Sequence, residues 1–367
     1  MTATTLRRNV AEDVRAALPA WVVARVLVAA AYGIARVWRS HFHHGELTIQ
    51  LHQGLFAWDG AFYRDIASKG FGALPDAALR FFPLFPLSGR GLGWVLGGND
   101  GIALLLIANA AALAAGALLH RLVVIDLVDR RTAHLSASLL ALAPPAFVLV
   151  WAYAEALYLV CAIGVFVALR RRAWGWAAGL GLLAGLARPF GVVLAVPAAI
   201  EALRGWRHAR SRDRLARLAA IVAPVAGLLV FLVSIGSLEP IRQQGDLRGE
   251  WIDPLRAVVR AVGDLFGSQR FLDGLHAPFA IALIALVILC VRWLPPSYSA
   301  YAGIAVLSAL SATNLNSLER YGLNAFPVVI AMAMLARRWK IEWPTLVVSS
   351  GLMVAMCSAA WLGRYVP

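Results

Sequence analysis

Long apolar runs separated by short charged stretches dominate this sequence from residue 19 to residue 361. A helix needs roughly 20 apolar residues to cross the hydrocarbon core of a bilayer, which is about 30 Å thick. The pattern therefore predicts an all-α integral membrane protein, a polytopic bundle of about eleven transmembrane helices that forms one domain over residues 1–367. The expected crossings are 19–38, 99–120, 133–151, 154–169, 173–187, 189–203, 218–236, 276–292, 299–312, 322–336 and 344–361.

Composition agrees with this interpretation. Hydrophobic residues make up 60% of the chain, charged residues make up 15%, and the mean hydropathy is +0.71. Soluble globular proteins carry fewer apolar and more charged residues than this. In a soluble protein the formal net charge of +14 would suggest a nucleic-acid partner. In a membrane protein, basic loops on the cytoplasmic side explain such a charge, so we expect no nucleic-acid partner.

The basic residues also predict an orientation. If the amino terminus lies in the cytoplasm, basic residues outnumber acidic residues in the loops on that side, whereas the other side is nearly balanced. We therefore expect a multi-pass protein of the cell membrane with its amino terminus inside and its carboxyl terminus outside. The loops expected inside are 121–132, 170–172, 204–217, 293–298 and 337–343.

Two apolar segments are not simple crossings. Residues 81–98 contain Pro83, Pro86 and several glycines, which oppose a regular helix, so we expect a membrane-dipping segment there. Residues 174–203 are too long for one crossing. Because Pro189 disfavours helix in the residue before it, we expect two short helices with a bend between them.

Two long loops lie on the predicted outer face of the bundle, at residues 39–98 and 237–275. Binding and catalytic residues are often found on loops that a rigid scaffold positions. The first loop is expected to hold an active-site helix and juxtamembrane helices as well as the membrane-dipping segment.

The best candidate for such a helix is the segment 55–71. As a helix, it places Asp59, Phe62, Tyr63 and Ile66 on one face, because these positions follow the helical period. A carboxylate then shares an apolar and aromatic face. From spacing alone two interpretations stay open: an interfacial amphipathic helix capped by Asp59, or a helix that carries a functional carboxylate.

Short motifs spread along the chain resemble the signature of the PIG-V family. In chain order they are Trp58-Asp59-Gly60 followed by Tyr63, Phe81-Phe82-Pro83-Leu84-Phe85-Pro86, Tyr153-Ala154-Glu155-Ala156-Leu157, Ala187-Arg188-Pro189-Phe190-Gly191 and Glu319-Arg320-Tyr321. The family comprises the glycosylphosphatidylinositol mannosyltransferase II enzymes and their bacterial relatives, within the GT-C class of glycosyltransferases. The chain departs from the family pattern at Pro189-Phe190, where a small polar residue is expected before the glycine.

The resemblance implies a GT-C-like bundle that transfers mannose on the extracytoplasmic face. It implies a polyprenyl-phosphate mannose donor, surrounding membrane lipids and an acceptor hydroxyl on a lipid, glycan or protein that the sequence does not identify. No cofactor is implied. Asp59 is then the catalytic base. The substrate-binding residues implied are Phe62, Tyr63, Glu155, Arg188, Arg320 and Tyr321.

The chemistry of the charged residues is consistent with this role. Asp59, Glu155, Arg188 and Arg320 come from four separate segments, yet the predicted topology places all four at the outer membrane boundary. Ionisable residues at membrane depth usually face a cavity or a partner. The planar guanidinium of arginine can bond two phosphate oxygens at once. The alternative is structural: Arg188 and Arg320 pair with Glu155 and Glu319 and only tie the bundle together.

A histidine tract in the first outer loop comprises His41, His43 and His44, with His52 nearby. Such a tract can bind a divalent metal. Transfer from a lipid phosphate needs no metal in principle, because arginines can offset the charge of the leaving phosphate. We therefore expect no metal site and interpret the tract as part of an interfacial loop.

Two rival functions stay open. A transporter or lipid flippase would use the same charged residues to line a pathway, and it would show inverted repeats with ionisable residues at mid-membrane. We find no repeat, and the charges gather on one face. A transferase of the same fold for another sugar, such as arabinose or glucose, differs only in a few hydrogen bonds that the sequence does not locate.

Overall fold

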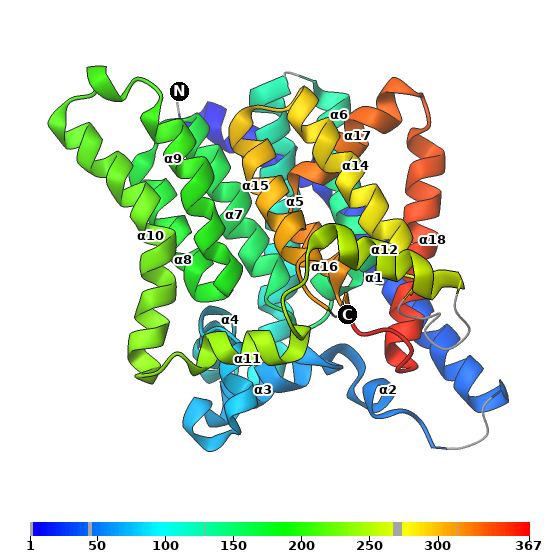
Figure 1. Ribbon diagram of the computed structural model, residues 1–367. Coiled ribbons are helices and arrows are strands. Elements are labelled where there is room, and N and C mark those ends of the chain that lie inside the picture. Colours follow the sequence, from blue (N-terminus) through cyan, green and yellow to red (C-terminus); the bar gives the residue numbers. More distant parts are fainter. Residues whose placement is uncertain (1–2, 43–45, 128, 267–273, 314) are drawn as a thin grey trace.

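The structure is a computed structural model that describes residues 3–42, 46–127, 129–266, 274–313 and 315–367. These residues form helices and connecting segments, and no β-strand is present among them. The longer helices run side by side, and the segments of the two long loops gather at one end of the bundle (Figure 1). The amino terminus lies at the other end. We call the first end the loop end and the second the far end.

The α-helices are α1 (Ala3–Phe42), α2 (Ile49–Gln53), α3 (Asp59–Lys69), α4 (Leu84–Val95), α5 (Asp100–Leu127), α6 (Arg130–Leu142), α7 (Glu155–Arg170), α8 (Trp174–Ala187), α9 (Ala195–Leu203), α10 (Ser211–Ile235), α11 (Glu239–Arg248), α12 (Pro254–Phe266), α14 (Ala277–Trp293), α15 (Pro296–Leu310), α16 (Leu318–Asn324), α17 (Pro327–Arg338) and α18 (Glu342–Trp361). Short 3-10 helices are η1 (Gly54–Phe56), η2 (Phe71–Ala73), η3 (Asp76–Arg80), η4 (Pro144–Leu149), η5 (Pro189–Leu194) and η6 (Trp206–His208). The expected all-α class is confirmed for the described residues.

Four helices among the described residues are long and apolar enough to cross a membrane. They are Val10–Phe42, Asp100–Leu127, Ser211–Ile235 and Glu342–Trp361. The other expected crossings correspond to shorter helices; α6, for example, has 13 residues and is about 20 Å long. The apolar helices indicate a membrane protein, whereas about eleven crossings and the orientation of the chain stay predictions.

The expected crossing 133–151 is not one helix, because α6 ends at Leu142 and the pair Pro144-Pro145 follows. The irregular chain after it is buried, so its backbone groups need partners within the protein. Arg25 of α1 donates to the carbonyl of Leu149 at 3.4 Å, and Asn109 of α5 donates to that of Val150 at 3.1 Å. These contacts explain why α1 carries a charge at this depth.

The expected crossing 322–336 is also divided. Helix α16 ends at Asn324, and α17 begins at Pro327, a residue that suits a first helical turn because its missing N–H needs no partner there. As a result, α16 is a short helix of its own. It carries Arg320 into the interior, where this side chain is 8% exposed.

Residues 84–95 form the regular helix α4, so the expectation that prolines and glycines prevent a helix here is wrong. Pro86 lies in the first turn, where no backbone hydrogen bond is lost. A Cβ at Gly89 would come within 2.4 Å of the Leu104 side chain, and one at Gly93 within 2.1 Å of Asp100. The glycines therefore allow α4 to pack closely on α5.

The expected bend between two short helices at Arg188-Pro189 is present, because α8 ends at Ala187 and η5 and α9 follow. Helix α8 packs on α10 without side chains between them: a Cβ at Gly185 would lie 2.2 Å from the Pro224 carbonyl oxygen. A Cβ at Gly191 would lie 2.3 Å from the Ala184 carbonyl oxygen. The turn therefore folds tightly back on α8, and Arg188 is held at its start.

Candidate active site

The expected helix around Asp59 is present as α3, in the first long loop. Its buried residues include Tyr63 and Ile66, which belong to the face expected from the sequence. The indole N–H of Trp58 donates to the Ala360 carbonyl at 2.9 Å, so the start of α3 is tied to the end of α18. The backbone N–H of Asp59 donates to the Tyr153 hydroxyl at 3.2 Å. Contacts from distant segments thus hold Asp59 in place.

Four charged side chains meet beside the start of α3. Arg320 donates to Asp59 Oδ2 at 2.5 Å, and its Nε lies 3.4 Å from Glu155 Oε1. Arg188 forms an ion pair with the same oxygen of Glu155. The formal charges of the two guanidinium groups and the two carboxylates cancel. We call Asp59, Glu155, Arg188 and Arg320 the charged cluster.

Aromatic rings enclose the charged cluster. The Arg320 guanidinium lies 5.5 Å from the ring centres of both Tyr153 and Tyr321, and that of Arg188 lies 5.7 Å from the Tyr321 ring. Such contacts favour a cation without taking its hydrogen-bonding groups. The rings therefore leave the guanidinium N–H groups available to oxygen ligands.

Phe62 and Tyr63 pack on Phe81, the first residue of the motif that ends at Pro86. The ring centres of Phe62 and Phe81 are 4.9 Å apart and stacked, and Tyr63 meets Phe81 edge-on at 5.0 Å. Burial, together with the negative charge of Glu155, raises the pKa of Tyr63 far above its usual value. The Tyr63 phenol is therefore neutral at physiological pH and cannot act as the base.

Exposure distinguishes the two carboxylates. The Asp59 side chain is 24% exposed, whereas that of Glu155 is 1% exposed. Arg320 Nε and Glu155 Oε2 are buried and have no hydrogen-bond partner among the described residues. Buried polar atoms without partners are rare and often occur at functional sites. Asp59 is thus the member of the cluster that an external hydroxyl can reach.

The cluster differs from the purely structural pairing that the sequence left open. Arg188 does pair with Glu155, but Arg320 pairs with Asp59 and Glu155. Glu319 turns the other way and contacts His276 Nδ1 at 2.8 Å. The structure therefore brings Asp59, Glu155, Arg188, Arg320 and Tyr321 together, with Phe62 and Tyr63 on the helix that Asp59 begins.

Sequence reasoning missed several neighbours of the site. Tyr153 contacts Asp59, and its signal was present, because it belongs to the motif that contains Glu155. Glu319 also accepts a hydrogen bond from the Tyr365 hydroxyl at 2.9 Å, which closes a buried group with His276. No sequence pattern indicated the roles of His276 and Tyr365, because these residues are distant from Glu319 in the chain and meet it only in the folded structure.

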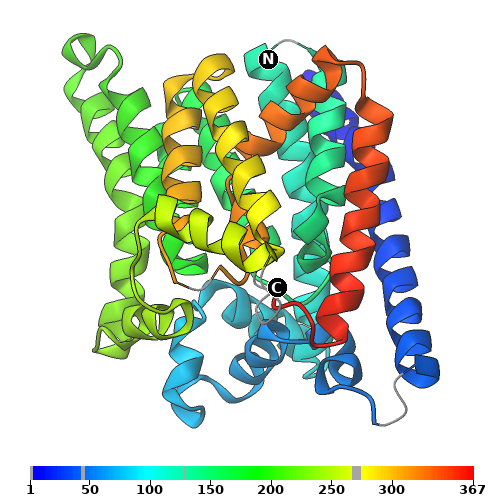
Figure 2. The same cartoon turned by 45° about the vertical axis from the view of Figure 1, so that its right-hand side comes forward.

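A cavity of about 1,050 Å³ runs between α6, α14, α17 and α18. Figure 2 shows α14, in yellow, to the left of α18, in red, and the carboxyl terminus near the loop end. Side chains along the cavity are mainly apolar. Its polar residues include His276, Glu319, Tyr365 and Arg364, which come from the loop-end parts of the lining. We call this cavity the apolar groove.

Helix α16 separates the apolar groove from the charged cluster. Glu319, Gly322 and Leu323 line the groove, whereas Arg320 extends to Asp59 on the other side. Glu319 and Arg320 are adjacent in the chain. The polar end of the groove and the cluster are therefore separated by a single short helix.

No group of three or more His, Cys, Asp or Glu side chains within the described part of the chain could hold a metal ion. Two residues of the histidine tract, His43 and His44, lie outside the described residues. His41 contacts Ser40 and the Val37 carbonyl near the end of α1. A metal role for the tract is therefore not tested.

No model of a known protein family matches this sequence, and no curated protein matches it. Among solved structures, oligosaccharyltransferase from Archaeoglobus fulgidus is similar. The structure with a tethered acceptor peptide containing the NVT sequon has 12% identity, a TM-score of 0.49 and a match over 96% of this chain and 56% of that one. The apo form has 14% identity and a TM-score of 0.48, with the same coverage.

The complex of the same oligosaccharyltransferase with Zn and sulfate has 13% identity and a TM-score of 0.46, over 93% of this chain and 53% of that one. This chain thus spans little more than half the length of those structures. Similarity at this level decides neither the fold family nor the activity of the chain.

Proposed function

We propose that this protein is a membrane glycosyltransferase that moves a mannosyl residue from polyprenyl-phosphate mannose to an acceptor hydroxyl on the extracytoplasmic face. The observation that carries the proposal is the charged cluster. It places a partly exposed carboxylate, Asp59, against Arg320 and next to Glu155 and Arg188. The resemblance of these segments to the PIG-V family supports the choice of sugar and donor.

Asp59 is the proposed general base. As the acceptor hydroxyl oxygen attacks the anomeric carbon, its proton passes to the Asp59 carboxylate and the bond from that carbon to the phosphate oxygen breaks. A single displacement of this kind inverts the anomeric carbon, through a transition state with oxocarbenium character like that of glycosidases. The polyprenyl phosphate leaves as an anion and needs no acid.

Arg188 and Arg320 are proposed to stabilise the leaving phosphate. Preorganised cations in a site that excludes water supply a large part of the catalytic effect in many enzymes. Both guanidinium groups already lie in the cluster, and the Nε of Arg320, which faces Glu155 Oε1 at 3.4 Å, makes no hydrogen bond among the described residues. Glu155 holds the two arginines together, because one of its oxygens contacts both.

The apolar groove is proposed to hold the polyprenyl chain of the donor. Its lining is mainly apolar, and its polar residues lie next to α16, the helix that carries Arg320. A lipid whose chain lies in the groove would extend past α16 to bring its phosphate to the cluster. Phe62 and Tyr63 would then border the sugar, as the sequence resemblance implies.

The test is to supply membranes containing the protein, and membranes lacking it, with labelled polyprenyl-phosphate mannose. We expect a labelled mannosylated product only with the protein present. If the mannose donor gives no product but lipid-linked arabinose or glucose does, the sugar is wrong and the class is right. If no lipid-linked sugar gives a product, the proposal of a transferase is wrong.

A further inference from the structure

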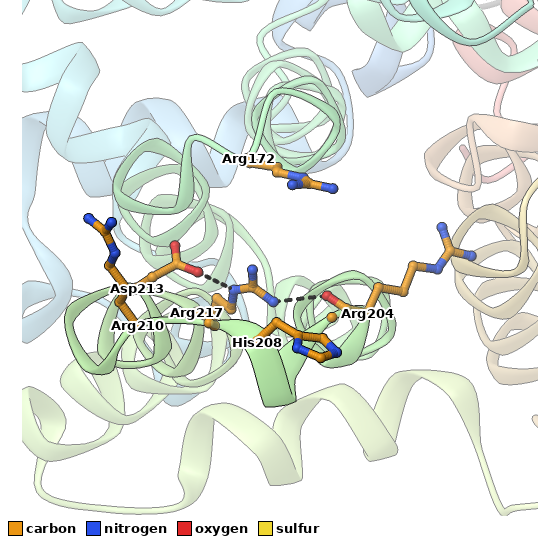
Figure 3. Close-up of a pocket in the computed structure, with 8 residues that line it drawn as sticks. Arg172, Arg204, His208, Arg210, Asp213 and Arg217 are labelled. Carbon is orange, nitrogen blue, oxygen red and sulfur yellow. Dashed lines mark hydrogen bonds and ion pairs between the residues drawn. The ribbon is translucent and has the colours of Figure 1, made fainter.

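A basic pocket of about 390 Å³ lies at the far end of the bundle, where α7 and α9 end and α10 begins. Figure 3 shows Arg172 directed into the space above Arg217 and His208, with Arg210 and Arg204 on either side. We call it the basic pocket. Its charged and titratable lining residues are Arg172, Arg204, His208, Arg210, Asp213 and Arg217.

Two of the four arginines in the basic pocket have partners that neutralise them. Arg217 donates to Asp213 at 2.8 Å, and Arg204 pairs with Glu201 at 3.0 Å. The side chains of Arg172 and Arg210 make no hydrogen bond or ion pair within the described part of the chain. The pocket therefore has two positive charges to offer an external anion.

The backbone around the pocket is fixed. Arg172 has φ of 54°, a left-handed conformation that few residues other than glycine adopt. Arg217 is buried and donates to the carbonyls of Ala202 at 2.8 Å and Arg204 at 2.9 Å. These bonds satisfy carbonyls at the end of α9 and hold the floor of the pocket.

Tryptophan residues lie near the basic pocket. The Trp174 ring lies 5.0 Å from the Arg217 guanidinium, and the Trp206 ring lies 6.0 Å from that of Arg214. Trp176 of α8 is 74% exposed. Tryptophan is enriched at membrane–water interfaces, and arginine there extends its charge to the phosphate layer.

We propose that the basic pocket binds the phosphate of an anionic phospholipid, in the leaflet opposite the one next to Asp59. Arg172 and Arg210 bond the phosphate oxygens, because a guanidinium can offer two parallel N–H groups to such a group. The anionic lipid supplies the countercharge that the protein lacks at this position. The site is independent of the proposed transfer reaction.

The test is a titration of the purified protein in detergent with phosphatidylglycerol and with phosphatidylcholine, followed by native mass spectrometry. We expect phosphatidylglycerol to bind more tightly. The double variant Arg172→Gln with Arg210→Gln should weaken that binding about tenfold or more, because charge-assisted hydrogen bonds are lost. The matched control is Arg171→Gln with Arg212→Gln, which removes the same charge from exposed residues outside the pocket and should leave binding nearly unchanged.

Three results would overturn the proposal. Equal weakening in the two double variants would mean a diffuse attraction with no site. Equal binding of phosphatidylcholine would remove the role of lipid charge. Displacement of the lipid by inorganic phosphate at an equal concentration would identify a site for free anions.

Discussion

The two ends of the bundle carry arginines in opposite circumstances. At the loop end, Arg320 is buried, the Arg188 side chain is 11% exposed, and the two are paired with two carboxylates. At the far end, Arg172 and Arg210 are exposed, and their side chains have no partner among the described residues. Removing one partner from a buried ion pair costs several kcal/mol, whereas exposed charges cost little to change. The ion pairs of Arg188 and Arg320 can therefore fix the geometry of a site. Arg172 and Arg210 have no such partners and can only attract a ligand.

This difference shows why arginine content alone does not locate a site. The far end carries the excess of basic residues that the positive-inside rule explains. A search for a functional site by net charge alone would therefore select the far end. Arginine–carboxylate pairs of low exposure occur at both ends, because Arg170 pairs with Asp126 and Glu201 at the far end. What distinguishes the cluster at the loop end is that one of its carboxylates, Asp59, is partly exposed. The predictions below test whether the loop end is the one that does chemistry.

The largest expected effect is on Asp59. Asp59→Asn keeps the shape of the side chain but cannot take a proton, and loss of a general base typically lowers a rate about a hundredfold to ten-thousandfold. The matched control is Asp65→Asn on the same helix, whose carboxylate is 40% exposed and pairs with Lys69 at 3.4 Å. Sugar transfer by the two purified variants should differ by that factor. Equal rates would remove Asp59 from the mechanism, with Glu155 the next candidate.

The next effect is on stability. Glu155→Gln leaves Arg188 and Arg320 with less countercharge in a buried place, and breaking a buried pair costs about 3–5 kcal/mol. Glu239→Gln is the control, because this residue of the second long loop lies 4.0 Å from Arg242 and accepts a hydrogen bond from Gln243 that a glutamine oxygen can also accept. The unfolding temperature in detergent should fall markedly for Glu155→Gln and stay unchanged for Glu239→Gln. An unchanged transition would show that Glu155 does not hold the arginines together.

A smaller effect is expected from replacing each cluster arginine by lysine. Arg188→Lys and Arg320→Lys keep the charge but lose the two-pronged geometry, so turnover should fall about tenfold or more while the protein stays folded. Arg292→Lys, at the exposed end of α14, is the control and should leave turnover unchanged. Normal turnover in both cluster variants would favour a purely structural role for the two ion pairs.

The smallest effect tests how the site is held. Gly185→Ala forces α8 away from α10, because the new Cβ would lie 2.2 Å from the Pro224 carbonyl oxygen. Overpacking of this kind costs about 1–3 kcal/mol, and it should also disturb Arg188 at the end of α8. Gly179→Ala on the same helix has open space around it and should be neutral or slightly stabilising. Unfolding temperatures of the two variants would show whether this close contact matters.

The sequence predicted the helical class for a physical reason. Apolar runs of this length need helices. The charged residues were chosen through the resemblance to the PIG-V family; the structure brings them together, and their role as a site stays a prediction. The sequence did not predict where helices break. Hydropathy continues across Pro144-Pro145 and Phe326-Pro327, so both were placed inside single crossings.

The opposite error concerned α4, where glycines were counted against a helix. Packing outweighs this propensity, because Gly89 and Gly93 permit contact with Leu104 and Asp100 that larger residues would prevent. The group of Glu319 with His276 and Tyr365 was also invisible in the sequence. Its members lie more than 40 positions apart and meet only in the folded chain.

The central claim is that Asp59 does chemistry and does not merely hold Arg320. Binding of labelled polyprenyl-phosphate mannose, measured on the same purified Asp59→Asn protein as transfer, separates the two roles. The base contacts the acceptor and not the phosphate, so we predict donor affinity within about threefold of wild type, less than 1 kcal/mol, with transfer almost abolished. Loss of binding together with transfer would contradict the claim, because it would show that the Asp59–Arg320 ion pair only maintains the site.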